Sequence, residues 1–332
     1  MPINLRNRNF ISLTDFTTRE LEYLLDLAEE LKREKLAGTR HKRLEGKNIV
    51  LVFEKGSTRT RASFEIAAHD EGAHVTYFGP EDTHFGSESL KDSSRVLGEM
   101  FDGIGYRGFS QESVETLAKY AEIPVWNGLT DLGHPSQALV DFMSAKEVLD
   151  KSYRDMKFAF VGNGQDNISN SLMIGAAKMG MQYSIVAPKE LWPEAKLVKQ
   201  AQKIAKETGA VIQITDNIKK GVKNADVITT DVWVSMGESS ELWQKRIELL
   251  KPYQVTMEMM KMTENPDTVF THCLPAYHNL ETDLGRKIYK EFGLKEMEVT
   301  DEVFESDKSI VFNGPENRIH VLRSIMVASL GV

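Results

Sequence analysis

Cysteine and long apolar segments, two features that would restrict the protein's environment, are scarce or missing. The 332 residues include a single cysteine, Cys273, so no disulfide can form within the chain. No apolar run reaches the roughly 18 residues needed to cross a bilayer. The first residues, MPINLRNRNF, lack the apolar core and cleavage site of a secretory signal. A cytoplasmic protein with no membrane partner is therefore expected.

Concentrated positive charge and metal-ligand motifs are also missing. The formal net charge is −8, and the densest basic stretch, Arg40–Asn48, contains the acidic Glu45. This favours a solvated surface segment over a nucleic-acid site. No histidine occurs in an H-E-x-x-H motif or in Cys/His ligand spacing, so we expect no metal site and no cofactor. The composition is 41% hydrophobic and 27% charged, and together with the length it suits two globular domains.

Strand-like and helix-like segments alternate along the chain. The first helix is expected over about Thr17–Leu36, where Thr17 and Glu20 have capping-box spacing. Strands are expected at Asn48–Glu54, His74–Phe78, Gly103–Arg107, Pro124–Asn127, Lys157–Val161, Tyr183–Val186, Val211–Ile214, Val227–Thr230 and Val269–His272. Helices are expected at Arg59–Ala68, Ser89–Phe101, Glu112–Tyr120, His134–Val148, Ser169–Met179, Pro193–Glu207, Glu241–Leu250 and Glu316–Leu330. This alternation predicts an α/β protein with two doubly wound parallel-sheet domains that divide near residue 150.

A candidate anion site follows the first predicted strand, where Ser57, Thr58, Arg59 and Thr60 open a helix. A helix start presents unpaired N–H groups and the positive end of the helix dipole, and Arg59 adds a planar fork suited to phosphate. An ordinary Ser/Thr cap followed by surface arginines is the alternative. The position after a buried strand favours the anion site. The Walker A frame is absent.

A glycine-containing turn after the strand Lys157–Val161 superficially resembles a dinucleotide-binding turn. Gly162 and Gly164 have the right spacing, but the third glycine of G-x-G-x-x-G would fall at Asn167. The fingerprint therefore fails, and a dehydrogenase is disfavoured. Asn167, at the start of a helix, suits the carboxylate or ammonium group of an amino acid instead.

Five ordered segments together resemble the aspartate/ornithine carbamoyltransferase family. They are FEKGSTRTRASFE at Phe53–Glu65, YRG at Tyr106–Gly108, HPSQ at His134–Gln137, DVWVSMGE at Asp231–Glu238 and HCLP at His272–Pro275. With ENR at Glu316–Arg318, the resemblance covers essentially the whole chain. The Asp-x-x-x-Ser-Met-Gly form and HCLP are similar to the ornithine-specific branch of the family.

The resemblance implies two α/β domains that each bind one substrate, with the active site in the cleft between them. Residues 1–150 would bind carbamoyl phosphate, and the C-terminal helix 316–332 would pack back on this domain. Residues 151–315 would bind L-ornithine. The family also assembles as trimers or as assemblies of trimers, with active sites at subunit interfaces, so a homotrimer is implied.

The resemblance also implies roles for individual residues. Carbamoyl phosphate would be held by Ser57, Thr58, Arg59, Thr60, Arg107, His134, Gln137, Cys273, Leu274 and Arg318. Ornithine would be held by Asn167, Asp231, Ser235 and Met236. Catalysis would depend on Arg107, His134, Asp231 and Cys273. The implied reaction produces citrulline and phosphate, or runs in reverse during arginine breakdown.

The residue types suit this chemistry. An amine attacks the carbamoyl carbon, negative charge develops on the carbonyl oxygen, and Arg107 and His134 are suitable donors to it. Asp231 is placed to orient the ammonium, and Cys273 to position the amine and help deprotonate it. Taken singly, a cysteine at a strand end is more often an inert apolar residue, and a lone histidine is usually structural. The support therefore comes from the residues as a set.

Some segments depart from the family pattern. The loop Thr83–Ser89 is about one residue shorter than usual, His84 replaces a glutamine, and a lysine is lost. Asn163–Asn167 replaces a common Asp-Ala-Arg-Asn-Asn run. Two alternatives to an ornithine carbamoyltransferase thus stay open. One is a carbamoyltransferase for a related amine, such as putrescine or a modified ornithine. The other is a weakly active paralogue with a binding or structural role.

Overall fold

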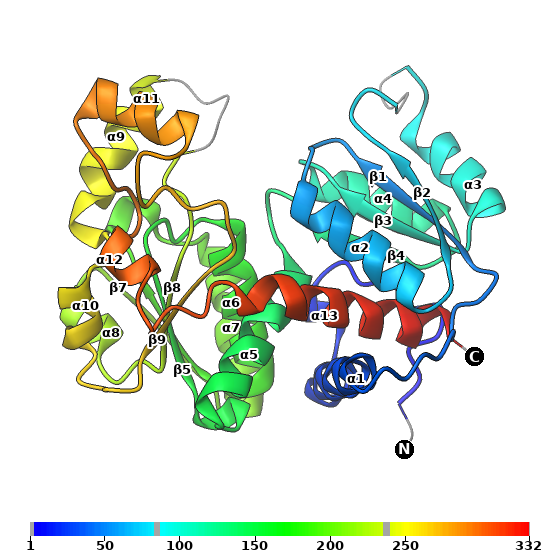
Figure 1. Ribbon diagram of the computed structural model, residues 1–332, viewed down its shortest axis with the longest axis horizontal. Helices are drawn as coiled ribbons and strands as arrows, with labels where there is room; N and C mark the ends of the chain where they lie inside the picture. Colours follow the sequence, from blue (N-terminus) through cyan, green and yellow to red (C-terminus); the bar gives the residue numbers. More distant parts are fainter. Residues whose placement is uncertain (1–2, 83–86, 235–239, 332) are drawn as a thin grey trace. The chain divides into compact units, whose positions relative to one another are not determined.

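The chain folds into two compact units, each built on a parallel β-sheet (Figure 1). The computed structural model describes residues 3–82, 87–234 and 240–331. The first unit comprises Met1–Met143 and Pro315–Val332, and the second comprises Ser144–Gly314. Both changes from one unit to the other fall within helices, α5 (Pro135–Leu149) and α13 (Asn313–Leu330). The predicted α/β class with two parallel sheets joined by helices is confirmed.

The sheet of the first unit has the strand order β2-β1-β3-β4. Its strands are β1 (Asn48–Phe53), β2 (His74–Phe78), β3 (Gly103–Arg107) and β4 (Val125–Leu129). All neighbours pair in parallel, and Phe53 at the end of β1 lies opposite Arg107 at the end of β3. Because the chain winds outward in both directions from β1 and β3, the point where the strand order reverses lies between these two strands. Ligands of doubly wound sheets bind outside the carboxyl ends at such a point.

Helices α1 (Thr18–Leu36), α2 (Thr58–Asp70), α3 (Leu90–Met100) and α4 (Gln111–Tyr120) also belong to the first unit, with a short 3-10 helix at Leu13–Asp15. The capping box predicted for α1 is present: the Thr17 hydroxyl accepts from the Glu20 N–H, and the Glu20 carboxylate accepts from the Thr17 N–H. The buried face of α1 consists of the leucines and alanine that recur at helical spacing.

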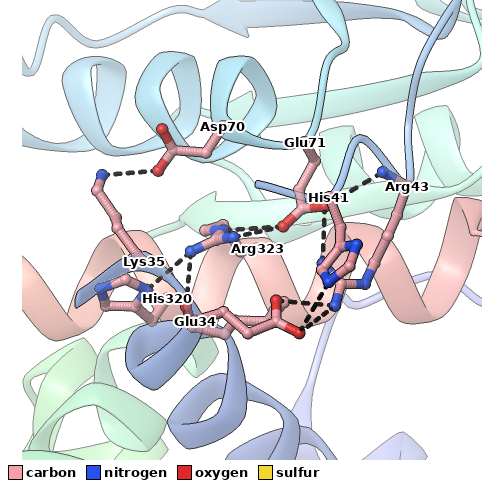
Figure 2. Close-up of polar contacts among 9 residues, drawn as sticks. Glu34, Lys35, His41, Arg43, Asp70, Glu71, His320 and Arg323 are labelled. Atoms are coloured by element: carbon pink, nitrogen blue, oxygen red, sulfur yellow. Dashed lines mark hydrogen bonds and ion pairs between the residues drawn. The ribbon is translucent and has the colours of Figure 1, made fainter. Parts of the chain in front are cut away.

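A buried ion pair ties α13 to the rest of the first unit (Figure 2). Arg323 of α13 donates from Nε and Nη2 to Glu71 Oε1 at 3.1 and 2.5 Å, and from Nη1 to the Leu31 carbonyl at 2.9 Å. Arg43 reaches the other carboxylate oxygen of Glu71 at 3.4 Å and also donates to Glu34 at 2.7 Å. These contacts place α13 beside α1, although the two helices lie at opposite ends of the chain.

The sheet of the second unit has the order β7-β6-β5-β8-β9. Its strands are β5 (Lys157–Val161), β6 (Gln182–Val186), β7 (Val211–Thr215), β8 (Val227–Thr230) and β9 (Val269–His272). All pairings are parallel. The strand order reverses between β5 and β8, so residues that follow these two strands lie where a doubly wound sheet binds its ligand.

Seven helices of the second unit are α6 (Asn167–Met179), α7 (Ala195–Thr208), α8 (Ile218–Val222), α9 (Ser240–Leu250), α10 (Met257–Met262), α11 (Asp283–Phe292) and α12 (Asp301–Phe304), and 3-10 helices lie at Tyr153–Asp155, Lys189–Leu191 and Lys251–Tyr253. Helices α8, α10, α11 and α12 were not predicted. Three of them have six residues or fewer, too few for a helical period to be visible in the sequence. Within the described residues, no helix has both the length and the apolar composition needed to cross a membrane.

Candidate active site

The carboxyl ends of β1 and β3 bring an arginine to the start of α2 in the first unit. Ser57 caps this helix: its hydroxyl accepts from the Thr60 N–H at 3.3 Å and donates to the Thr60 hydroxyl at 3.1 Å. Arg107 Nη1 donates to the same Thr60 oxygen at 3.1 Å. Capping accounts for Ser57, but it does not require a guanidinium from another strand. A cation, hydroxyl groups and the N–H groups of a helix start thus lie together, which is the combination that binds phosphate.

The two arginines in the first turns of α2 have different surroundings. Arg61 is exposed, donates to Glu65 at 2.8 Å and lies over the Tyr77 ring at 3.7 Å. Arg59, the second residue of the helix, is partly buried. Arg61 is therefore a solvated surface residue, as the simpler interpretation of this segment proposed, whereas the position of Arg59 keeps it a candidate phosphate ligand.

A second group in the first unit joins α5 and α13. Arg318 Nη2 donates to Gln137 Oε1, and Gln137 Nε2 donates to Asp141 Oδ1 at 2.7 Å. All three side chains are buried. Asp141 was not predicted, and its position one helical turn after Gln137 is the signal that identifies it.

His134 lies in the positive field of this group. It is 3% exposed, and its pKa is held well below the ordinary range by burial and by the charges of Arg318 and Arg107. The ring is consequently neutral at neutral pH and can donate from one nitrogen. The first unit therefore brings together Arg107, His134, Gln137 and Arg318, four of the predicted carbamoyl-phosphate residues.

In the second unit, two aspartates meet where the sheet reverses. Asp166 follows β5 and caps α6: its Oδ1 accepts from the Ile168 N–H at 2.7 Å. Its carboxyl group lies within interaction range of that of Asp231. Asp231 follows β8 and accepts from the Val232 N–H at 2.8 Å. Burial, and then the Asp231 charge, raise the Asp166 pKa well above its usual range.

Asn167 lies beside this pair as the first residue of α6. Its Oδ1 atom is buried and has no hydrogen-bond partner among the described residues. Asn167 and Asp231 were predicted as site residues, but Asp166 was not. The signal for Asp166 was its position directly before Asn167 at a helix start, where aspartate is a favoured cap.

The end of β9 adds a cysteine to this group. One polar atom each from Asp231, His272 and Cys273 lie within 4.8 Å of one another. His272 Nδ1 accepts from the Leu274 N–H at 2.9 Å, which leaves Nε2 to carry the ring proton of the neutral form, and Nε2 faces Glu298 Oε1 at 3.6 Å. Cys273 and Leu274, expected to contact carbamoyl phosphate, thus belong to the second unit with Asp231.

Neither this group nor a second one, His278 with Asp301 and Glu305, is assigned as a metal site. The Nδ1 lone pair of His272 is used by a backbone N–H. His278 Nδ1 is hydrogen-bonded to Asp301 at 2.6 Å. The predicted site residues His84, Ser235 and Met236 lie outside the residues that the structure describes.

Both units match models of one protein family. Residues 8–147 match the model described as aspartate/ornithine carbamoyltransferase, carbamoyl-P binding domain. Residues 154–329 match the model described as aspartate/ornithine carbamoyltransferase, Asp/Orn binding domain. The Thr60–Arg107 contact lies in the first matched range and the Asp166–Asp231 contact in the second.

Similar proteins match over the full length. The chain is 64% identical to an ornithine carbamoyltransferase of Limosilactobacillus reuteri, covering 100% of this chain and 99% of that one. It is 58% identical to a Streptococcus agalactiae protein named ornithine carbamoyltransferase 1, catabolic, covering 99% of each. The solved ornithine carbamoyltransferase from Pyrococcus furiosus superimposes with a TM-score of 0.90 at 36% identity and 99% coverage of both chains.

Proposed function

Because the chain belongs to the aspartate/ornithine carbamoyltransferase family, we propose that it transfers the carbamoyl group of carbamoyl phosphate to the side-chain amine of L-ornithine. The products are citrulline and phosphate, and the same groups catalyse the reverse reaction. The observation that carries the proposal is the hydrogen bond from Arg107 to Thr60 at the start of α2. It lies in the part of the chain that matches a carbamoyl-phosphate-binding domain.

Transition-state charge is stabilised by Arg107 and His134 in this proposal. As the amine attacks, the carbamoyl oxygen becomes negative and needs donors that are already oriented. Arg107 is held by Thr60, and neutral His134 can donate a hydrogen bond without giving up its proton. Gln137, held between Arg318 and Asp141, binds the carbamoyl amide.

Phosphate departure depends on the start of α2. Ser57, Thr58 and Thr60 supply hydroxyl and N–H donors, and Arg59 and Arg318 supply charge-assisted hydrogen bonds. These contacts strengthen as negative charge moves from the carbamoyl group onto the leaving phosphate.

The amine acceptor is bound by groups of the second unit. Asp231 accepts from an ammonium group of ornithine, and Asn167, Ser235 and Met236 complete the contacts. The sulfur of Cys273 lies near Asp231. In its thiolate form it can position the attacking amine and accept the proton that the amine loses. Leu274 contacts the carbamoyl end of the substrate.

We further propose that the protein works in the cytoplasm as a homotrimer or an assembly of trimers. These expectations come from the family resemblance and from the single cysteine. Light scattering coupled to size-exclusion chromatography measures the assembly directly. A mass near one 37.5 kDa chain at assay concentrations would contradict it.

The activity is tested with purified protein and carbamoyl phosphate, supplied separately with ornithine, putrescine, N-acetylornithine or aspartate. We expect a ureido product from ornithine alone, and carbamoyl phosphate formation when citrulline and phosphate are supplied. A product formed from a different amine would show that this amine, and not ornithine, is the acceptor. Folded protein that forms no product from any of the amines would refute carbamoyl transfer.

A further inference from the structure

Asp166 occupies a position in the second unit where the fold gathers ligand-binding groups. It follows β5, Asp231 follows β8, and these strands are neighbours at the point where the strand order reverses. The two carboxyl groups, 65 residues apart in the chain, lie within interaction range of each other. Capping α6 requires only one oxygen of Asp166, the Oδ1 that accepts from Ile168, so capping leaves the contact with Asp231 unexplained.

The acceptors around this pair are suited to an ammonium group. Asp166 and Asp231 provide carboxyl oxygens, and the buried Asn167 Oδ1 has no partner among the described residues. A buried acceptor without a donor costs free energy unless a ligand supplies the donor. An ammonium group has three N–H donors and a positive charge, which satisfies one amide oxygen and two carboxyl groups together.

We propose, building on the proposed function, that Asp166 determines specificity for the acceptor: with Asp231 it forms a two-carboxyl receptor for the α-ammonium group of an amino acid. Two carboxyl groups this close repel each other when both are charged, which favours the form in which one of them carries a proton. That proton is displaced when the ammonium binds. The ammonium keeps its own three protons, no covalent bond forms, and the displaced proton passes to the buffer.

Neither His272 nor Cys273, which lie near Asp231, supplies the two carboxyl groups with a positive charge that could take the place of this proton. His272 has its Nδ1 occupied by Leu274 and its Nε2 directed toward Glu298. Cys273 lies near Asp231 and carries no positive charge. Backbone N–H groups of Ile168 and Ser169 donate to Asp166, which favours its charged form once an ammonium is present.

Proton release is measured by calorimetric titration with L-norvaline, which is ornithine without its side-chain amine and therefore cannot react. Titrations at one pH in buffers of different ionisation enthalpy give the number of protons released. We expect the wild type to release up to one proton more than Asp166→Asn. Asparagine keeps the α6 cap because its side-chain oxygen can accept from Ile168, so folding is preserved.

Kinetics provide a second measurement. The quantity compared is kcat/KM for ornithine, expressed as the wild-type value divided by the Asp166→Asn value. As the pH is lowered beneath the point at which the pair loses its proton, this ratio should fall about tenfold per pH unit. Asp166→Asn should also lower the preference for ornithine over N-acetylornithine, which lacks the α-ammonium, by tenfold or more, because the receptor then has one carboxyl group fewer. Glu194→Gln is the matched control, since Glu194 is an exposed N-cap residue of α7 whose side chain makes no cap hydrogen bond.

The outcomes separate this inference from the proposed function. If the wild type forms citrulline but wild type and Asp166→Asn release equal numbers of protons and have parallel pH profiles, the role of Asp166 is overturned and the proposed function stands. Absence of citrulline in the wild type would instead overturn the proposed function. A change of the same size in Glu194→Gln would show a general charge effect and would also overturn the receptor.

Discussion

Removing one partner of the Glu71–Arg323 ion pair should destabilise the first unit strongly. Glu71 is fully buried and Arg323 is 3% exposed. The carboxylate accepts two hydrogen bonds from Arg323 and contacts Arg43 as well (Figure 2). Glu71→Ala removes these acceptors and leaves the charge of Arg323 buried without its carboxylate.

The expected magnitude follows from this burial. Leaving one charge of a buried pair uncompensated costs about 3–5 kcal/mol. Each kcal/mol corresponds to a change of roughly 2–4 °C in Tm for domains of about 150–250 residues, so the Tm should fall by on the order of 10 °C. Lys35→Ala is the matched control. It breaks the Lys35–Asp70 pair, whose side chains are 42% and 22% exposed, and should cost about 0.2–1 kcal/mol.

Thermal unfolding followed by circular dichroism measures both changes. Arg318 lies five residues before Arg323 on α13, so a loosened helix should also raise the KM for carbamoyl phosphate in Glu71→Ala. Equal Tm shifts in Glu71→Ala and Lys35→Ala would refute the argument that burial makes this ion pair strong. An unchanged KM would refute the coupling to Arg318.

Three other predictions concern single residues. Arg59→Ala should raise the KM for carbamoyl phosphate at least tenfold because a charge-assisted phosphate contact is lost. Arg61→Ala is the control and should behave as wild type, since the Arg61 guanidinium is engaged by Glu65. Equal effects of the two substitutions in steady-state kinetics would contradict the assignment of Arg59. Cys273→Ser should lower kcat for ornithine by tenfold or more and leave carbamoyl-phosphate binding intact in calorimetry, and the opposite pattern would show that Cys273 is misplaced. Burial and neighbouring cations lower the pKa of His320 to about 4. Between pH ~6.5 and 4 the unfolded chain therefore binds a proton that the folded protein does not, so the free energy of unfolding is full above pH ~6.5 and falls by up to about 3 kcal/mol as the pH approaches 4. Unfolding free energies across this range should therefore vary less in His320→Gln, and an identical pH dependence in the two proteins would exclude His320.

Local sequence patterns were sufficient for most secondary structure. The strands at Gly103–Arg107 and Lys157–Val161 have the predicted bounds, since a buried parallel strand is a short apolar run between turn residues. Helix α1 was predicted by its cap and its leucine spacing. The short helices α8 and α12 were not, because helices of this length depend on tertiary packing more than on their own sequence.

The sequence by itself also determined which chemical groups the protein offers: hydroxyls and an arginine at the start of a helix after a buried strand, and polar residues after later strands. These signals are local, since a strand end and a helix cap are visible within a few residues. Which groups meet was decided by the tertiary structure. Arg318 contacts Gln137 across 181 positions and Arg323 contacts Glu71 across 252, and Asp166 meets Asp231 because β5 and β8 are neighbours in the sheet. Strand order and helix packing bring these residues together, and a single sequence read along its length does not contain that order.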